Sequence, residues 1–381
     1  KSALALLLAI SIMNLIRFPL YSLHHFSVSP TSHRGSHVSV LRVNLPFDAQ
    51  KAKFHKELQV AVDAVETACS LCVDVQKSLL SNVGRIFEKG DQTLVTIADF
   101  GVQALISLVL SRQFPSIPLV AEEDSSYLCE NNLVHPLTAL VKSKSTVGSL
   151  TEQDILAAID RGVKPVNGEK PATYWMLDPI DGTKGFVKGA DSLYVVGLSL
   201  IVEEKIVLGV MGCPNWAKSV VPPSDSLSSG IIMIAHAGFG TWTKQLHTSS
   251  LSYPWSRCHV DDHSSVDEAH FCIPESQTWA SMGLSEDEVF LSSPCCGSLC
   301  KYLMVAMGEA SVFIQRAKTR VMAWDHAVGV ICVEEAGGKV TDWNGKGLDF
   351  RDDIEQRRII FPVGGILVTN NKLHPQILNL L

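Results

Sequence analysis

Two aspartates, Asp178 and Asp181, stand directly after the apolar run 174–177 and are separated by a proline and Ile180. We expect a strand over 174–177 followed by a turn, because proline fixes its own φ and Gly182 permits a tight backbone approach. Such a turn aims both carboxylates and the Ile180 carbonyl at one point. These oxygens are the ligands that Mg²⁺ prefers. The alternative is an ordinary turn capped by an aspartate.

Two further acidic groups occupy comparable positions elsewhere in the chain. Glu122, Glu123 and Asp124 follow the apolar run 117–121, and Asp325 opens an otherwise apolar stretch. Taken singly, the first group is typical of a charged loop and the second of a helix N-cap. Three acidic groups at strand ends or at a helix start fit a multi-metal phosphate site better than three unrelated loops and caps.

Hydrophobic periodicity predicts the elements that must position these acids, and it indicates an α/β or α+β enzyme. Residues 125–150 are polar and predict irregular structure, and the polar segment 244–270 is the candidate domain boundary. The expected helices cover 53–80, 99–112, 151–162, 299–307 and 325–336, and the expected strands cover 91–97, 117–121, 174–177, 193–202, 205–213, 231–235, 240–243 and 310–315.

Composition narrows the class of protein. The chain has 381 residues, 46% hydrophobic and 19% charged, so it can bury a sizeable core. At about 100–200 residues per domain, two domains are expected. The net charge of −7 argues against a general nucleic-acid binder, which concentrates Lys and Arg to neutralise phosphates. Cys69 and Cys72 fall on one face of the helix expected over 53–80, so we interpret them as core residues.

The first 47 residues contain no Asp or Glu and carry arginines, serines and histidines. This composition is typical of an organelle transit peptide. A secretory signal competes with it, because the apolar run Ala3–Ile16 suits an h-region and falls short of the roughly 20 residues that span a bilayer. We expect residues 1–48 to be a transit-like segment, removed or without fixed structure, for a mitochondrion or a chloroplast. The secretory pathway and the cytoplasm are the alternatives.

Three motifs in order carry a resemblance to a known family. The string Asp178-Pro-Ile-Asp-Gly-Thr183, with Glu122-Glu123 upstream and Trp324-Asp-His-Ala-Val-Gly329 downstream, resembles the lithium-sensitive, Mg²⁺-dependent phosphatase superfamily. Its members include inositol monophosphatases, fructose- and inositol-polyphosphate phosphatases and 3′(2′),5′-bisphosphate nucleotidases. Asp181-Gly-Thr-Lys-Gly-Phe186 and Gly212-Cys-Pro-Asn215 are similar to the nucleotidase branch of plant type. The resemblance runs from about residue 53 to the end.

The resemblance implies a layered αβαβα sandwich of the inositol monophosphatase type. Two subdomains are expected, an α+β metal-binding subdomain over 49–250 and an α/β subdomain over 251–381 that completes the site and contacts the nucleotide. The metal site would lie between them, and it would hold two or three Mg²⁺ ions.

The resemblance also implies a role for each site residue. Asp99 and Thr183 would activate the attacking water, and Gly182 and Thr183 would cradle the phosphate. The metal ligands would be Glu122, Asp178, Asp181, Asp325 and the Ile180 carbonyl. Ser298 and Lys301 would contact the nucleotide. The arginine that nucleotidases carry downstream is Gln315 here, with Arg316 next to it, so Arg316 is a further substrate-binding candidate.

The activity implied is removal of the 3′-phosphate of 3′-phosphoadenosine 5′-phosphate (PAP), or of its sulfated form PAPS, by metal-activated water. A small-molecule nucleotide is the expected partner, without nucleic acid or membrane, and the chain is expected to be a monomer or a weak homodimer. Three alternatives stay open at this point: an inositol or sugar phosphate phosphatase, an inactive relative that binds phosphonucleotides, and a structural partner in an organelle complex.

Overall fold

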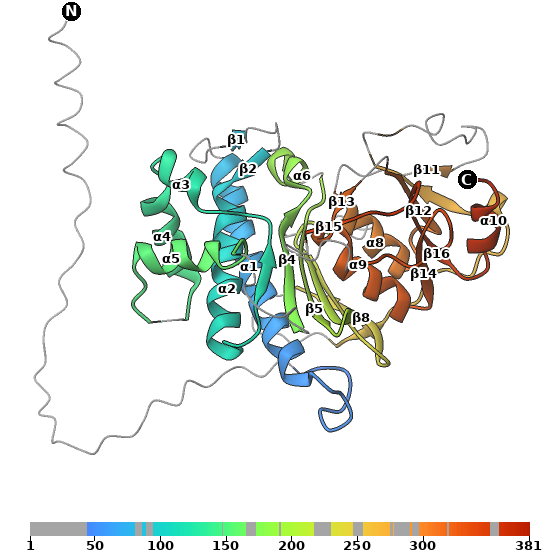
Figure 1. The fold of residues 1–381 in the computed structure, drawn as a ribbon, viewed down its shortest axis with the longest axis horizontal. Helices are drawn as coiled ribbons and strands as arrows, with labels where there is room; N and C mark the ends of the chain where they lie inside the picture. Colours follow the sequence, from blue (N-terminus) through green and yellow to red (C-terminus); the bar gives the residue numbers. More distant parts are fainter. Residues whose placement is uncertain are drawn as a thin grey trace, which may run out of the picture. The chain divides into compact units, whose positions relative to one another are not determined.

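Two β-sheets and the helices packed against them form the computed structural model of the chain (Figure 1). All described residues belong to one compact unit. The structure describes residues 44–80, 86–88, 94–146, 148–164, 173–189, 192–216, 230–246, 254–274, 277, 290–291, 297–317, 320–350 and 358–381.

The larger sheet has seven strands in the order β3-β4-β5-β6-β7-β8-β9. Its first pair is parallel and every other neighbouring pair is antiparallel. The adjacent strands expected over 193–202 and 205–213 are confirmed as the antiparallel hairpin of β5 and β6. The strands are β3 (Leu119–Ala121), β4 (Thr173–Asp181), β5 (Val195–Val202), β6 (Lys205–Cys213), β7 (Ile231–His236), β8 (Gly240–Gln245) and β9 (Ser256–Arg257).

The second sheet has five strands in the order β11-β10-β12-β16-β14. Two short two-stranded pairs, β1-β2 and β13-β15, complete the described strands. The strands of the second sheet are β10 (His270–Cys272), β11 (Phe290–Leu291), β12 (Val312–Arg316), β14 (Gly338–Asp342) and β16 (Gly365–Asn370). Those of the two short pairs are β1 (Ile86–Glu88), β2 (Leu94–Thr96), β13 (Val321–Met322) and β15 (Ile359–Ile360).

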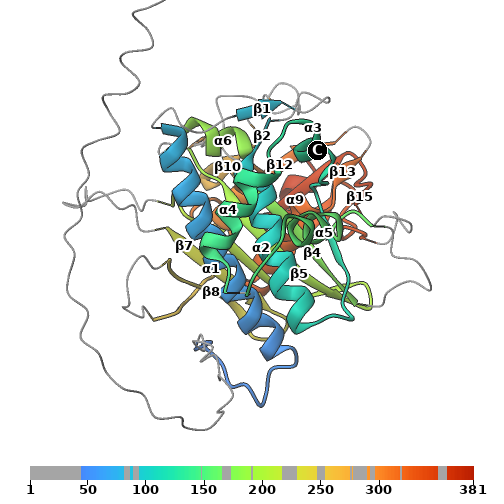
Figure 2. The same cartoon turned by 90° about the vertical axis from the view of Figure 1, so that its left-hand side faces the viewer.

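Helices fill the layers on both sides of each sheet. α1 (His55–Leu80) and α2 (Ile97–Gln113) cover one face of the larger sheet, as Figure 2 shows from the side. α8 (Ser298–Ala306) and α9 (Trp324–Glu335) lie between the two sheets, and α10 (His374–Leu378) packs on the second sheet. The described residues thus form the expected αβαβα layering. The remaining helices are α3 (Ser126–Glu130), α4 (Val134–Lys144), α5 (Glu152–Asp160), α6 (Thr183–Lys188) and the 3₁₀-helix η1 (Val266–Glu268).

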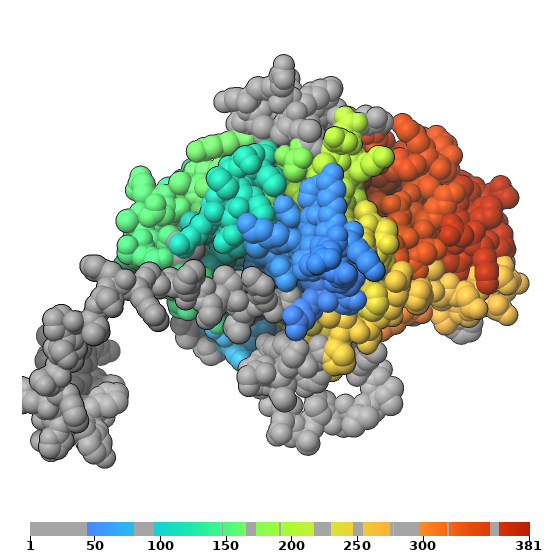
Figure 3. All heavy atoms as spheres, turned by 90° about the horizontal axis from the view of Figure 1, so that it is seen from below, coloured from blue at the N-terminus to red at the C-terminus, as the bar shows by residue number. Residues whose placement is uncertain are grey.

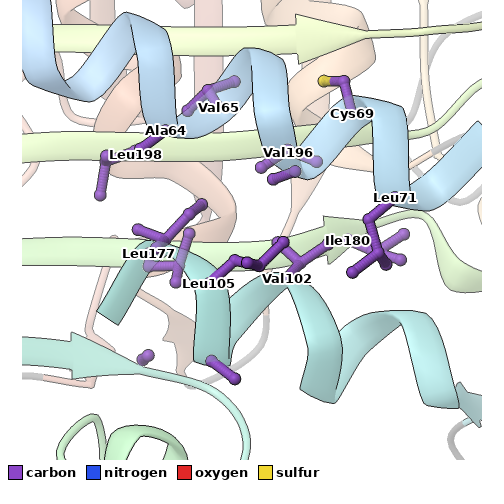
Figure 4. Packing of buried hydrophobic residues seen from close by; sticks show 14 of the residues in the cluster. Ala64, Val65, Cys69, Leu71, Val102, Leu105, Leu177, Ile180, Val196 and Leu198 are labelled. Carbon is purple, nitrogen blue, oxygen red and sulfur yellow. The ribbon is translucent and has the colours of Figure 1, made fainter. Parts of the chain in front are cut away.

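The layers are held together by the apolar faces of their helices and strands, which the hydrophobic periodicity predicts. Residues of α1 and α2 interdigitate with strands β4 and β5 in Figure 4. Cys69 and Cys72 are buried on the inner face of α1, which confirms their interpretation as core residues. A Cβ on Gly212 would lie 2.4 Å from the Cys69 sulfur, and one on Gly197 would lie 2.4 Å from Leu299. Glycines in β5 and β6 therefore let a helix approach each face of the sheet closely.

The sequence prediction was wrong over residues 125–150, which contain α3 and α4 instead of irregular structure. Leu137 and Val141, four positions apart, are fully buried. Helix α4 is short and its outward side is polar, so its apolar face shows over too few turns to outweigh the polar composition. The expected strand ending at residue 177 also continues further, because β4 runs through Asp181.

The start of the described chain packs against the larger sheet, whereas the sequence predicts that residues up to 48 belong to the transit-like segment. Trp255 Nε1 donates to the Asn44 carbonyl at 2.7 Å, and the Phe47 ring lies 5.5 Å from that of His236. In Figure 3 the blue start of the described chain lies beside the yellow β8–β9 region. We therefore propose that residues 44–48 belong to the folded domain. No helix of the described residues has the length and apolar character needed to cross a membrane.

The packing of residues 44–48 predicts two different outcomes for truncated chains. A chain that starts at residue 44 should keep the melting temperature and the activity of the full chain. A chain that starts at residue 49 loses Phe47 and the bond to Asn44, and we expect its melting temperature to fall by about 4–8 °C. Thermal unfolding measured by circular dichroism distinguishes them, and equal melting temperatures would contradict the proposal that residues 44–48 belong to the folded domain.

Candidate metal centre

Three carboxylates converge where β4 ends and α9 begins. Asp178 and Asp181 come from β4 and Asp325 from the first turn of α9. One ligand oxygen from each lies within 4.8 Å of the others. Asp178 is 2% exposed and Asp181 is 6% exposed, and Asp325 is half-buried. The structure therefore brings together three of the four carboxylates that the sequence had singled out.

The end of β4 departs from regular strand geometry. The pairing register with β5 shifts between Asp178 and Asp181, which indicates a bulge. Both aspartates are therefore strand residues rather than turn residues, and the turn begins at Gly182. Gly182 has φ 86° and ψ 42°, a left-handed backbone conformation that residues with a side chain rarely adopt. Helix α6 starts immediately after it. Bulges of this kind commonly re-aim side chains beside active sites.

Burial and mutual repulsion disfavour the charged forms of these acids. Burial raises the pKa of Asp178 well above its ordinary value, and the charges of Glu122, Asp181 and Asp325 raise it further. Burial also raises the pKa of Asp325, with added effects from Asp181 and Glu122. The pKa of Asp181 rises to about 6 because of burial, although bonds from Leu299 and Ser298 and the charge of Lys301 oppose the rise.

One oxygen of this group lacks a hydrogen-bond donor in the part of the chain that the structure describes. Asp178 Oδ1 is buried and has no hydrogen-bond partner among the described residues. A buried carboxylate oxygen without a donor is costly unless a cation neutralises it. The available donors are carboxylate oxygens, which suit a hard divalent cation such as Mg²⁺. The residues present therefore fit a divalent metal ion held by Asp178, Asp181 and Asp325.

Glu122 lies at the edge of this group. It follows β3 directly and is half-buried, and its charge raises the pKa of all three clustered aspartates. It is not among the three carboxylates with oxygens within 4.8 Å of one another. Gln103 of α2 fixes the backbone of this acidic segment, since Gln103 Oε1 accepts from the Glu123 amide at 2.9 Å and Gln103 Nε2 donates to the Ile159 carbonyl at 2.9 Å.

Asp99 and Thr183 meet across the base of the site. Asp99 is 2% exposed, and its Oδ2 accepts from the amide and the hydroxyl of Thr96, both at 2.8 Å. These bonds close a capping box at the start of α2 and fix the direction of the carboxylate. Asp99 Oδ1 lies 3.3 Å from Thr183 Oγ1, which is also 3.1 Å from the Ile180 carbonyl. The structure thus places the expected acid–hydroxyl pair within hydrogen-bond distance.

The expected nucleotide contacts lie at different depths. Ser298 opens α8 and its amide donates to Asp181 Oδ1 at 3.1 Å. Lys301 is 1% exposed, and its Nζ donates to the Gly297 carbonyl at 3.0 Å. Arg316 is exposed at the end of β12, where its backbone amide and carbonyl bond the side chain of Gln277. The Ser298 hydroxyl donates to Gln315 Oε1 at 3.4 Å.

Two residues of the site escaped the sequence analysis. Gln103 lies in the mostly apolar stretch of α2, and a polar amide between apolar neighbours was its one signal in the sequence. Gly297 lies against the Asp181 carboxylate, with its Cα so close that a Cβ would reach 2.0 Å from Oδ1. Nothing local in the sequence distinguishes this glycine from any other residue that precedes a helix.

Solved structures share this fold. The chain matches an IMPase from Thermotoga maritima with a TM-score of 0.55 and 19% identity, over 85% of this chain and 96% of that one. It also matches CysQ from Bacteroides thetaiotaomicron, a bacterial member of the inositol monophosphatase family, with a TM-score of 0.53 and 20% identity. That match covers 83% of this chain and 98% of CysQ. At these identities the likeness shows the fold alone.

Sequence relatives are much closer. A relative from Arabidopsis thaliana is 55% identical over 93% of this chain and 94% of its own length, and its provisional name is mitochondrial 3′(2′),5′-bisphosphate nucleotidase. The 3′,5′-bisphosphate nucleotidase 2 of the same plant is 38% identical over 85% of this chain and 95% of its own length. The family model described as the inositol monophosphatase family matches residues 55–381. The chain therefore belongs to the inositol monophosphatase family.

Proposed function

We propose that this chain is a 3′(2′),5′-bisphosphate nucleotidase that removes the 3′-phosphate of PAP, and of PAPS, to give AMP or its sulfated counterpart. The observation that carries the proposal is the 55% identity to a relative named for this activity, over nearly the whole of both chains. A relative from Schizosaccharomyces pombe, 33% identical, bears the same enzyme name. The cluster of Asp178, Asp181 and Asp325, which could hold a metal ion, supports this proposal.

Asp178, Asp181 and Asp325 would hold the metal in this proposal, with Glu122 and the Ile180 carbonyl completing the ligand set. Mg²⁺ is the proposed ion, because all these ligands are oxygens. Two or three ions are consistent with the number of acids available. When bound, a divalent ion supplies Lewis-acid activation of water and stabilises charge on phosphate oxygens.

The chain's own residues would handle the proton. Thr183 Oγ1 is placed to accept a proton from the attacking water while it donates its own to Asp99 Oδ1, 3.3 Å away. The two bonds from Thr96 hold the Asp99 carboxylate in the orientation that this transfer needs. Gly182 and Thr183 turn the backbone sharply at the end of β4, and we propose that this turn cradles the phosphate.

Ser298, Lys301 and Arg316 are the proposed contacts to the rest of the substrate. PAP carries a second phosphate that a simple monophosphate lacks, so a cation outside the metal cluster must meet that charge. Lys301 Nζ donates to the Gly297 carbonyl at 3.0 Å, and its charge opposes the rise that burial causes in the pKa of the nearby Asp181 carboxyl. We propose that the same charge attracts the second phosphate.

We propose the mitochondrion as the destination, because the relative at 55% identity is named as mitochondrial and the first 47 residues of this chain lack acids. Fluorescence from residues 1–60 fused to a fluorescent protein should coincide with a mitochondrial marker in plant cells. Coincidence with chloroplasts instead would overturn the assignment.

Phosphate release tests the proposed activity directly. With Mg²⁺, we expect the highest kcat/KM on PAP or PAPS, and lower values on inositol 1-phosphate and fructose 1,6-bisphosphate. Asp99→Asn keeps an oxygen for the Thr96 bonds but cannot take the proton, so kcat should fall by about 10²–10⁴-fold. Preference for inositol 1-phosphate would favour the sugar phosphatase alternative, and no release from any substrate would favour an inactive relative.

Removing one carboxylate should change stability in opposite directions with and without metal. In EDTA at pH 8, Asp178→Asn relieves repulsion from four neighbouring acids, and we expect its melting temperature to rise by about 2–4 °C. With 10 mM Mg²⁺ the wild type should gain stability through binding, and the variant should gain little. Exposed Asp262→Asn is the matched control. If Mg²⁺ raises the melting temperature of all three proteins equally, the metal does not bind at Asp178.

The variant Lys301→Ala tests whether Lys301 contacts the nucleotide or has only a structural role. A charge-assisted contact to the second phosphate should make kcat/KM for PAP fall about 10- to 100-fold. The loss on inositol 1-phosphate should be much smaller, since that substrate has no second phosphate. Exposed Lys339→Ala should leave both values unchanged. Equal losses on the two substrates would show that Lys301 is structural or serves the metal site, and would contradict the nucleotide contact.

A further inference from the structure

Asp181 connects two distant parts of the chain. Its Oδ1 accepts from the Ser298 amide at 3.1 Å and its Oδ2 accepts from the Leu299 amide at 2.7 Å. Amides in the first turn of a helix have no partner within the helix, so these bonds satisfy donors that α8 cannot satisfy itself. The same carboxylate belongs to the cluster with Asp178 and Asp325. Asp181 is therefore both a member of the candidate metal centre and the anchor of α8.

Gly297 makes this arrangement sterically feasible. A Cβ at position 297 would lie 2.0 Å from Asp181 Oδ1 and 2.2 Å from both Cγ and Oδ2, whereas real Cβ atoms essentially never come within 3.0 Å of another heavy atom. The backbone of Gly297, with φ −72° and ψ −169°, is open to any residue. The requirement for glycine at this position is therefore one of space and not of backbone conformation.

Neither side of this contact can move aside at low cost. The Asp181 side chain is short, buried and bonded at both oxygens, so a displacement breaks the bonds to Ser298 and Leu299. On the other side, Lys301 Nζ holds the Gly297 carbonyl at 3.0 Å. Leu299 is also seated on the sheet where Gly197 leaves room for it. A side chain at 297 must therefore shift either the carboxylate or the start of α8.

We propose that Gly297 is a positioning residue of the metal centre: its lack of a side chain lets Asp181 bond α8 and face the metal at the same time. The proposal rests on the metal site proposed above. A side chain at 297 should weaken divalent cation binding, and it should lower turnover of every phosphate monoester alike. This pattern differs from the one expected of a substrate contact, which affects some substrates more than others.

Mg²⁺ binding measured by titration calorimetry tests the proposal. We expect Gly297→Ala to bind Mg²⁺ at least about tenfold more weakly than the wild type, equivalent to about 1.4 kcal/mol. Excess Mg²⁺ should restore part of the activity on PAP and on inositol 1-phosphate to the same degree. Gly347→Ala is the matched control, because Gly347 is exposed and a Cβ there would meet nothing within 4 Å.

The variant Asp181→Asn shows whether a negative result contradicts the role of Gly297 or the proposed metal site itself. If Asp181→Asn binds Mg²⁺ like the wild type, the proposed metal site is wrong. If Asp181→Asn loses binding while Gly297→Ala keeps the wild-type affinity, the site stands and the role of Gly297 is overturned.

A second measurement covers the case in which Gly297→Ala does not fold. Asp181→Ala removes the three atoms nearest to the new Cβ, so adding Gly297→Ala to it should lower the melting temperature by less than about 2 °C. In the wild-type background the same change should lower it by more than about 4 °C, or prevent folding. Equal losses in both backgrounds would show that Gly297 does not act through Asp181.

Discussion

Crowding of like charges in a buried site is the constraint on which the rest of this structure depends. Asp178, Asp181 and Asp325 lie within 4.8 Å of one another, with the charge of Glu122 nearby. In a region of low dielectric such a group cannot stay ionised at modest cost without a compensating cation. Asp178 Oδ1, buried and without a hydrogen-bond partner among the described residues, is the atom on which this cost falls most directly. The geometry therefore suits a divalent cation, which would allow all three acids to be ionised.

Residues at the end of β4 contact helices on both sides of the larger sheet. On one side Asp99 of α2 reaches Thr183, and on the other Asp181 bonds the start of α8. Helix α9 supplies Asp325 from the same layer as α8. The bulge in β4 and the left-handed Gly182 let one stretch of chain face both layers. In the proposed mechanism, metal ligation, proton transfer and phosphate binding would all involve the residues at the end of β4.

Much of this could be predicted because its signals are local. Residues close together in the sequence are enough to predict helix α1, the Thr151–Asp154 capping box and the β5–β6 hairpin. The acids that converge were recognisable from their positions at element ends. By contrast, Gln103 and Gly297 act on partners that are distant in sequence, and Gly297 touches a carboxylate more than a hundred positions away. No local pattern encodes such a contact. The subdomain boundary near residue 250 stays a prediction.

Anomalous diffraction from crystals grown with Mn²⁺ tests the central claim most directly, because Mn²⁺ takes the same oxygen ligands as Mg²⁺ and is visible by its own scattering. The structure predicts at least one strong anomalous peak between the carboxylates of Asp178, Asp181 and Asp325. At saturating Mn²⁺, anomalous peaks confined to other parts of the molecule would contradict the assignment of these three aspartates as metal ligands.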